Sequence, residues 1–358
     1  MVRIGLIGFG QQGKLYSAIL TGIALPGMPA SPKPDGCVLT AVSARNEACK
    51  GQIEAMGVRY FQNWQDLVAS DVCDAVVITV PHFAHHEIAI GALNAGKHVL
   101  CEKPLEINTE RIDEIIEACD RNNVKLGCIF QMRVSPLIVE LKREMESGRF
   151  GKMLLASANM RWYRDNDYYD SSNWRGTWKY DGGGALINQA VHVVDTLLYI
   201  NGDVEAVSAF AGTFTHNIEV EDNLCATFKY RNGSFGTIEV STCCAPGFPR
   251  RIAFSGSNGT VAIEEDKVSR WEFVDSLPED EEIIKIFSGS SNENGGRSPL
   301  DISFTGHAVQ IADFADAIRN DRTPKVDGRE ARRAIELICA IYESARTGKT
   351  VYLQGADK

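Results

Sequence analysis

The sequence has no Cys-x-x-Cys pair, although its 358 residues include ten cysteines. Structural zinc sites and dithiol redox centres usually need such closely spaced pairs, so we expect neither. The cysteines fall mostly within apolar segments of a long chain, and the adjacent Cys243 and Cys244 are expected to be reduced. We therefore expect a reducing, cytoplasmic environment and no metal site.

The chain also lacks an excess of positive charge, long apolar runs and internal repeats. Its formal net charge of −10 disfavours nucleic acid or an anionic membrane as the main partner. No apolar run is long enough to span a bilayer. The first predicted strand begins at Val2, so we expect no signal peptide before it. The length favours a large core and more than one domain.

A glycine-rich turn joins the first predicted strand, residues 2–8, to a predicted helix. The turn reads Gly8-Phe9-Gly10-Gln11-Gln12-Gly13. A strand, this glycine spacing and a helix together form the context of a dinucleotide-binding site. The glycines permit a tight turn, a close approach of pyrophosphate and close packing of helix on strand. The helix N-terminus is then expected to hold the phosphates.

The second predicted strand, residues 37–42, ends without the acidic residue that usually binds the ribose 2′-hydroxyl of NAD. Ser43 and Arg45 follow it instead. A hydroxyl and a guanidinium suit a 2′-phosphate, so the sequence favours NADP over NAD. Alternatively, Arg45 stacks on adenine, which would serve either cofactor.

A later apolar strand is expected to end at Lys103-Pro104, because proline has no N–H to donate to a sheet. Glu102 and Lys103 therefore lie at the carboxyl end of a strand, where open α/β sheets bind ligands. We hypothesise that the preceding residues hold a nucleotide and that the following residues bring a substrate to Lys103. The alternative is an exposed lysine in a turn.

The second half of the chain is rich in β-like runs joined by short turns, which indicates an antiparallel sheet within an α+β domain. The predicted strands are residues 153–163, 204–214, 223–230, 234–242, 251–255 and 260–264. We expect a dinucleotide-binding domain over residues 1–130 and a substrate-binding and oligomerisation domain over residues 131–358. Residues 277–299 are expected to form a loop.

Residues 185–200 have helical periodicity, and Asn188, His192 and Asp195 fall on one predicted face. The alternative for His192 is a hydrogen-bonded core histidine. Upstream, three of the five tryptophans lie within residues 162–178. Aromatic faces with hydrogen-bonding tips suit a sugar or polyol ring, although an aromatic core or a subunit interface would also explain them.

These motifs together resemble the glucose-fructose oxidoreductase, inositol dehydrogenase and MocA (Gfo/Idh/MocA) family. The resemblance rests on the glycine turn, residues 79–85 and 96–104, and residues 182–195. It implies an α/β protein with an N-terminal Rossmann domain and a C-terminal domain that has a large open-faced, mainly antiparallel sheet. In this family that sheet commonly packs on a second subunit, so a homodimer or homotetramer is implied.

The resemblance also implies hydride transfer between NAD or NADP and a sugar, cyclitol or sugar derivative. Lys103 would bind the reacting oxygen and His192 would move its proton. Asn188 stands where the family often has Asp; it cannot take a proton, but it can hold a hydroxyl. Glu102 would contact the nicotinamide ribose, Trp174 and Arg175 would close over the cofactor, and the Lys103-Pro104 bond would be cis.

The expected cofactor-binding residues are Gly8, Phe9, Gly10, Gln11, Gln12, Ser43, Arg45, Thr79, Val80, Pro81, His85, Glu102, Lys103, Trp174 and Arg175. The expected substrate-binding residues are Lys103, Trp162, Arg164, Tyr168, Asn188 and His192. Two other functions remain open. One is a glycosidase of the same fold that oxidises, eliminates and retains its NAD. The other is a non-catalytic NADPH-binding regulator, which would need neither Lys103 nor His192.

Overall fold

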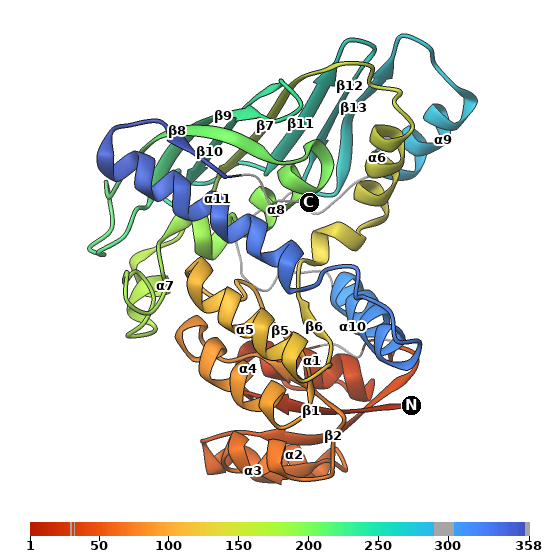
Figure 1. Cartoon of the computed structure of the whole chain (residues 1–358), viewed down its shortest axis with the longest axis vertical. Coiled ribbons are helices and arrows are strands. Elements are labelled where there is room, and N and C mark those ends of the chain that lie inside the picture. The colour runs from red at the N-terminus through yellow and green to blue at the C-terminus, as the bar shows by residue number, and fades with distance from the viewer. Residues whose placement is uncertain (29–30, 32, 290–303, 355–358) are drawn as a thin grey trace. The chain divides into compact units, whose positions relative to one another are not determined.

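The computed structural model describes residues 1–28, 31, 33–289 and 304–354 (Figure 1). The chain divides into two compact units. The first consists of Met1–Gln131 with Ser303–Arg332, and the second consists of Met132–Ile302 with Arg333–Lys358. Each unit is built on its own sheet.

The first unit contains a six-stranded sheet in the order β3-β2-β1-β4-β5-β6. Its strands are β1 Val2–Ile7, β2 Cys37–Ser43, β3 Arg59–Phe61, β4 Ala75–Ile78, β5 His98–Cys101 and β6 Leu126–Cys128. All five pairings are parallel, which confirms the predicted Rossmann fold. The chain order reverses between β1 and β4, and open α/β sheets bind ligands beside such a point.

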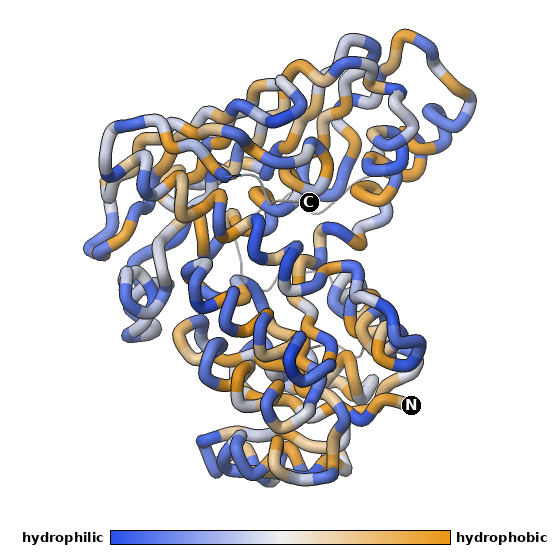
Figure 2. The backbone as a smooth tube through the Cα atoms, viewed as in Figure 1, coloured by the Kyte–Doolittle hydropathy of each residue, from blue (hydrophilic) through white to orange (hydrophobic). Residues whose placement is uncertain are grey.

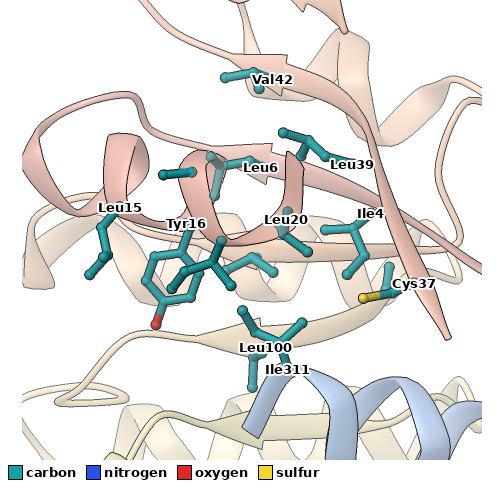
Figure 3. Packing of buried hydrophobic residues seen from close by; sticks show 14 of the residues in the cluster. Ile4, Leu6, Leu15, Tyr16, Leu20, Cys37, Leu39, Val42, Leu100 and Ile311 are labelled. Atoms are coloured by element: carbon teal, nitrogen blue, oxygen red, sulfur yellow. The ribbon is translucent and has the colours of Figure 1, made fainter. Parts of the chain in front are cut away.

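Helices pack on this sheet and bury its apolar residues. They are α1 Gln11–Thr21, α2 Lys50–Ala55, α3 Trp64–Ala69, α4 His85–Asn94, α5 Thr109–Arg121 and α10 Phe304–Arg319. Figure 3 shows the core cluster, in which Leu6, Tyr16, Leu39 and Ile311 come from β1, α1, β2 and α10. Each such large apolar side chain contributes about 1.5–3 kcal/mol when it is fully buried.

Helix α10 belongs to the first unit, whereas the expected boundary placed all of residues 131–358 in the second domain. Ile311 and Phe314 of α10 are buried in the first core. The chain that follows α10 also returns to the first sheet, because the N–H of Cys128 donates to the carbonyl of Val326 at 3.0 Å. An apolar helix face in a sequence does not reveal which of two cores it covers, so this return escaped prediction.

The second unit contains an eight-stranded sheet in the order β13-β12-β11-β7-β10-β9-β8-β14. Its strands are β7 Met153–Arg161, β8 Val204–Gly212, β9 Asn223–Tyr230, β10 Phe235–Ser241, β11 Arg251–Gly256, β12 Gly259–Glu264, β13 Lys267–Phe273 and β14 Val351–Tyr352. Only β7 and β10 pair in parallel, so the expected mainly antiparallel sheet is confirmed. Figure 2 shows hydrophobic and hydrophilic residues interspersed along these strands, as one buried and one open face require.

The helices of the second unit are α6 Pro136–Glu146, α7 Asn166–Asp170, α8 Val191–Asn201, α9 Pro278–Phe287 and most of α11 Gly328–Thr347. Helix α9 corrects the expected loop over residues 277–299, of which 290–299 lie outside the described residues. Its Asp280 accepts hydrogen bonds from Arg149 and from the indole N–H of Trp271, both at 2.8 Å. These distant partners stabilise a helix that its acidic sequence alone did not indicate.

None of the described helices is both long and apolar enough to cross a bilayer.

Candidate active site

The glycine turn lies at the point where the first sheet reverses its chain order. The N–H of Gly8 donates to the carbonyl of Ser43 at 2.9 Å, and the N–H of Thr79 donates to that of Ile7 at 2.9 Å. The turn therefore connects the carboxyl ends of β1, β2 and β4. A Cβ atom on Gly13 would overlap the carbonyl oxygen of Gly8, so the helix can start this close to the strand only with glycine.

Gly10 caps helix α1 and has open space around it. Apart from Gly10 and its two chain neighbours, no heavy atom of the described residues lies within 4 Å of the position that its Cβ would occupy, and none of their side chains caps the first turn of the helix. Its φ of −76° is accessible to every residue, so the backbone itself does not require glycine. Uncapped N–H groups beside an open cradle fit the phosphates of a dinucleotide.

The neighbouring cofactor candidates occupy the same edge of the sheet. Phe9 has its side chain in the core, so it offers only its backbone to a ligand. Ser43 is buried at the end of β2, whereas Arg45 is exposed just beyond it. Gln11 is exposed, and the side-chain oxygen of Gln12 is buried without a hydrogen-bond partner among the described residues.

The carboxylate of Glu102 is held from two sides within the first unit. The hydroxyl of Tyr16 on α1 donates to Glu102 Oε1 at 2.6 Å, and the backbone N–H of Lys103 donates to Oε2 at 3.0 Å. His307 Nε2 of α10 lies 3.9 Å from Oε1. Burial and the charge of Glu102 raise the pKa of Tyr16 well above its usual value, so Tyr16 remains a donor.

This arrangement links the helix after the glycine turn to the backbone of Lys103. The Lys103-Pro104 bond is cis, as expected. Sequence reasoning missed Tyr16 and His307. A tyrosine in the first turns of a helix does not by itself indicate a contact with a distant carboxylate, and no local pattern connects residue 307 to residue 102.

His85 lies fully buried between the loops that follow β4 and β5. Its Nε2 is 2.8 Å from the carbonyl oxygen of Val80, and its Nδ1 is 2.9 Å from that of Pro104. Burial lowers the pKa of His85 to about 4. Because its two ring nitrogens contact carbonyls of different loops, His85 joins the loop containing Val80 and Pro81 to the Lys103-Pro104 turn.

In the second unit, the expected continuous helix over residues 185–200 is interrupted. Residues Ala185–Gln189 form a π-helical turn, and α8 begins at Val191. Asp195 is buried and forms two hydrogen bonds with Arg133, at 2.6 and 2.8 Å. His192 and Asp195 remain three residues apart on α8, and the carboxylate of Asp195 is taken up by Arg133. Asn188 lies in the π-turn, and His192 lies in the first turn of α8.

Asn188 belongs to a network of polar side chains. Its Nδ2 donates to the buried Asp181 Oδ1 at 2.7 Å, and its Oδ1 accepts from Gln189 Nε2 at 2.9 Å. Gln189 also donates to the hydroxyl of Tyr168 at 2.7 Å and accepts from Arg164 Nη2 at 2.9 Å. The structure thus brings together three predicted substrate residues and adds Asp181 and Gln189, which sequence reasoning did not select.

Aromatic rings surround the two arginines of this region. The guanidinium of Arg164 lies over the rings of Trp162 and Tyr168, at 5.1 and 5.6 Å from their centroids. The guanidinium of Arg175 lies over Tyr168 and Trp174, at 4.6 and 5.1 Å. Such cation–π contacts order long side chains. The cluster combines aromatic faces with amide, hydroxyl and guanidinium groups, as polyhydroxylated ligands require.

A third group of side chains resembles a metal site in composition only. Ligand atoms of His216, Asp222 and Cys243 lie within 4.8 Å of one another. However, His216 Nδ1 is 3.0 Å from Asp222, and its Nε2 is 2.9 Å from the carbonyl oxygen of Arg164. Both ring nitrogens of His216 already have protein partners, so we interpret this cluster as a structural hydrogen-bond network and not as a metal site.

Two family models match the chain. The oxidoreductase family with an NAD-binding Rossmann fold matches residues 2–130, and the GFO/IDH/MocA C-terminal domain matches residues 138–262. A crystal structure of the WlbA dehydrogenase from Bordetella pertussis, in complex with NADH and UDP-GlcNAcA, shares 31% identity with a TM-score of 0.85, covering 99% of both chains.

The chain belongs to the Gfo/Idh/MocA family of NAD-binding oxidoreductases.

Curated relatives in this family match almost the full chain at lower identity. The myo-inositol 2-dehydrogenase of Thermotoga maritima is 25% identical, with 99% of both chains covered. The levoglucosan dehydrogenase of Pseudarthrobacter phenanthrenivorans is 24% identical, with 96% of both chains covered. Both NAD-dependent and NADP-dependent inositol dehydrogenases of Bacillus subtilis also match, so membership in the family leaves the cofactor preference open.

If the space at Gly10 serves a dinucleotide, Gly10→Ala should weaken NADH and NADPH binding by at least about tenfold, or about 1.4 kcal/mol. The unfolding temperature of the ligand-free variant should equal that of the wild type, because the added methyl approaches no described residue other than its chain neighbours. Calorimetric titration and thermal unfolding check the two halves of this prediction.

Gly51→Ala in α2 is the matched control, because its Cβ would also enter open space. It should bind both dinucleotides as the wild type does. Wild-type affinity in Gly10→Ala would show that the cradle does not hold the phosphates.

Proposed function

We propose that this protein is an NAD(P)-dependent dehydrogenase that transfers a hydride between a nicotinamide and a hydroxyl-bearing carbon of a sugar, cyclitol or sugar derivative. One observation supports the proposal most strongly. Tyr16, on the helix that begins at the glycine turn, is hydrogen-bonded to Glu102, and Glu102 binds the backbone of Lys103. The same unit thus joins a dinucleotide cradle to a lysine at the carboxyl end of β5.

In this proposal the residues of the chain orient the substrate and handle its proton. The ammonium of Lys103 lies against the reacting oxygen and stabilises its developing alkoxide character. The imidazole of His192 accepts the hydroxyl proton during oxidation and returns it during reduction, because a positioned imidazole can act as general base and general acid. Asn188 holds a substrate hydroxyl by hydrogen bonds. The bound dinucleotide supplies the hydride acceptor or donor.

The polar and aromatic cluster of the second unit favours a polyhydroxylated substrate. Trp162 and Tyr168 offer ring faces, and Arg164 and Asn188 offer hydrogen-bonding groups. Relatives named as inositol and levoglucosan dehydrogenases support sugars and cyclitols, and the WlbA complex with UDP-GlcNAcA adds sugar nucleotides. A screen of cyclitols, aldoses, anhydrosugars and sugar nucleotides with both cofactors identifies the substrate.

With a substrate from this screen, His192→Ala should lower turnover by about two or more orders of magnitude, because the positioned base is lost. Its affinity for the dinucleotide should stay at the wild-type value. Steady-state kinetics and dinucleotide titration measure the two effects.

His86→Ala is the control, since His86 pairs with Glu114 in the first unit. It should turn over substrate normally. Near-normal turnover of His192→Ala would remove His192 from the mechanism. Glycoside cleavage without net NADH release, in place of dehydrogenation, would contradict the proposed reaction and favour the glycosidase.

We also propose that NADP is preferred over NAD, because Ser43 and the exposed Arg45 follow β2. Arg45→Asp should shift the ratio of kcat/KM values for NADP and NAD towards NAD, since a carboxylate repels the 2′-phosphate. Kinetics with both cofactors measure the ratio, and an unchanged ratio would mean that Arg45 does not contact the phosphate.

The expected cytoplasmic location stays a prediction.

The open face of the second sheet suits a homodimer or homotetramer. Leu155 of β7 pairs in register with Phe235 of β10, and both are more than half exposed. Phe210 of β8 is 82% exposed. Apolar side chains gathered on an exposed sheet face indicate a protein interface. The molecular mass in solution tests this proposal, and a monomeric mass would contradict it.

A further inference from the structure

The glycine run before the π-turn is pressed against two other parts of the second unit. A Cβ atom on Gly184 would overlap the carbonyl oxygen of Glu221, and one on Gly183 would overlap the hydroxyl of Tyr342. Gly183 also has a φ of +153°, which side chains rarely allow. Glycines 183 and 184 are therefore required by close packing against Glu221 and α11.

Glu221 is buried and accepts hydrogen bonds from this segment. Its Oε2 accepts from the N–H of Gly184 at 2.9 Å, and its Oε1 accepts from the N–H of Leu186 at 2.8 Å. The hydroxyl of Tyr342 donates to Oε1 at 3.0 Å. The backbone carbonyl of Glu221 also accepts from the N–H of Ala185, at 3.0 Å. One residue thus holds three consecutive N–H groups at the start of the π-turn.

The bonds made by Glu221 determine where the next residues lie. The N–H of Asn188 donates to the carbonyl of Gly184 at 3.0 Å, and the N–H of Ala190 donates to that of Ala185 at 3.1 Å. The π-turn is therefore built directly on the residues that Glu221 holds. It carries Asn188 and ends just before α8, whose first turn carries His192.

We propose that Glu221 is a positioning residue for the reaction: through the backbone of Gly184 and Leu186, its carboxylate fixes the π-turn that presents Asn188 and leads to His192. This inference rests on the proposed function. A glutamine at this position could accept only through its oxygen, and its NH2 group would face an N–H donor. The substitution would therefore loosen the turn without changing the size of the side chain.

The charge state of Glu221 gives this role a measurable signature. Burial raises the pKa of Glu221 to about 7, although the N–H groups of Leu186 and Gly184 and the hydroxyl of Tyr342 act in the opposite direction. Tyr342 on α11 is the titratable group that bonds to the Glu221 carboxylate, and Asp181 before the turn acts in turn on Tyr342. Burial also raises the pKa of Tyr342, so it remains a donor.

Ionisation of Glu221 lowers the stability of the fold but strengthens the hydrogen bonds to the π-turn. Because its pKa in the folded protein exceeds the ordinary value of 4.5, ionisation costs folding stability as the pH rises through about 7. The turn nevertheless favours the ionised form, since protonation turns one carboxyl oxygen into a donor and weakens both oxygens as acceptors. Protonation below about pH 7 should therefore stabilise the fold while loosening the bonds to the π-turn.

Trp178 provides a reporter that requires neither substrate nor cofactor. Its ring lies against that of Tyr342, with the centroids 5.2 Å apart. The emission of Trp178 is obtained as the difference between the fluorescence of the wild type and that of Trp178→Phe, which retains the other tryptophans. We expect this signal in the ligand-free protein to titrate with a midpoint near pH 7. Glu221→Gln should abolish the transition, and His192→Ala should retain it.

Tyr342→Phe changes the pKa of Glu221 without replacing Glu221 itself. It removes a hydrogen bond that lowers the pKa of Glu221, so the midpoint should move to higher pH. A transition that persists unchanged in both Glu221→Gln and Tyr342→Phe would overturn the inference. This readout is independent of activity, so it stands or fails separately from the proposed function.

Kinetics then separate positioning from general stability. Glu221→Gln should lower kcat for the sugar substrate by about ten- to a hundredfold, as a misplaced catalytic group would, with the KM for the dinucleotide unchanged. Glu144→Gln is the matched control, because Glu144 on α6 is a buried glutamate of the same unit and pairs with Arg149. It should lower the unfolding temperature but leave kcat within about twofold of the wild type. A kcat of Glu221→Gln as high as that of Glu144→Gln would overturn the positioning role.

Discussion

Backbone packed on backbone, with no room for a Cβ atom, is the constraint on which the candidate functional residues of each unit depend. In the first unit, Gly13 lies against the carbonyl of Gly8 and lets α1 begin directly at the edge of the sheet. In the second unit, Gly184 lies against the carbonyl of Glu221 and lets the π-turn start there. Each contact aims backbone N–H groups in a defined direction: towards the open cradle at Gly10 in one unit and towards a buried carboxylate in the other.

Buried carboxylates carry this constraint to the residues assigned to the chemistry. Glu102 accepts from Tyr16 and from the backbone of Lys103, and Glu221 accepts from the backbone that leads to Asn188. Charged acceptors make stronger hydrogen bonds than neutral ones, so a buried carboxylate holds a loop more firmly than an amide would. In this account neither glutamate reacts with the substrate. Each keeps the backbone beside a proposed catalytic residue in place.

Sequence patterns predicted the parts of the structure that local periodicity encodes. The glycine turn and the strand that ends before Pro104 are each bounded by their own residues. Patterns did not predict features that arise from distant contacts. The 3.6-residue period over residues 185–200 reveals neither the π-turn nor the pairing of Asp195 with Arg133. His307 reaches Glu102 across two hundred residues of chain, which no local motif records.

The central claim is that Lys103 and His192 act on the same hydroxyl group of one substrate, and a double-mutant cycle in kcat tests it most directly. Groups that act as a unit show strongly non-additive losses. With a substrate found by the screen, the Lys103→Ala, His192→Ala double variant should be no more than a few-fold slower than the slower single variant. Losses that multiply in full would contradict the claim, because they would mean that the two side chains contribute independently.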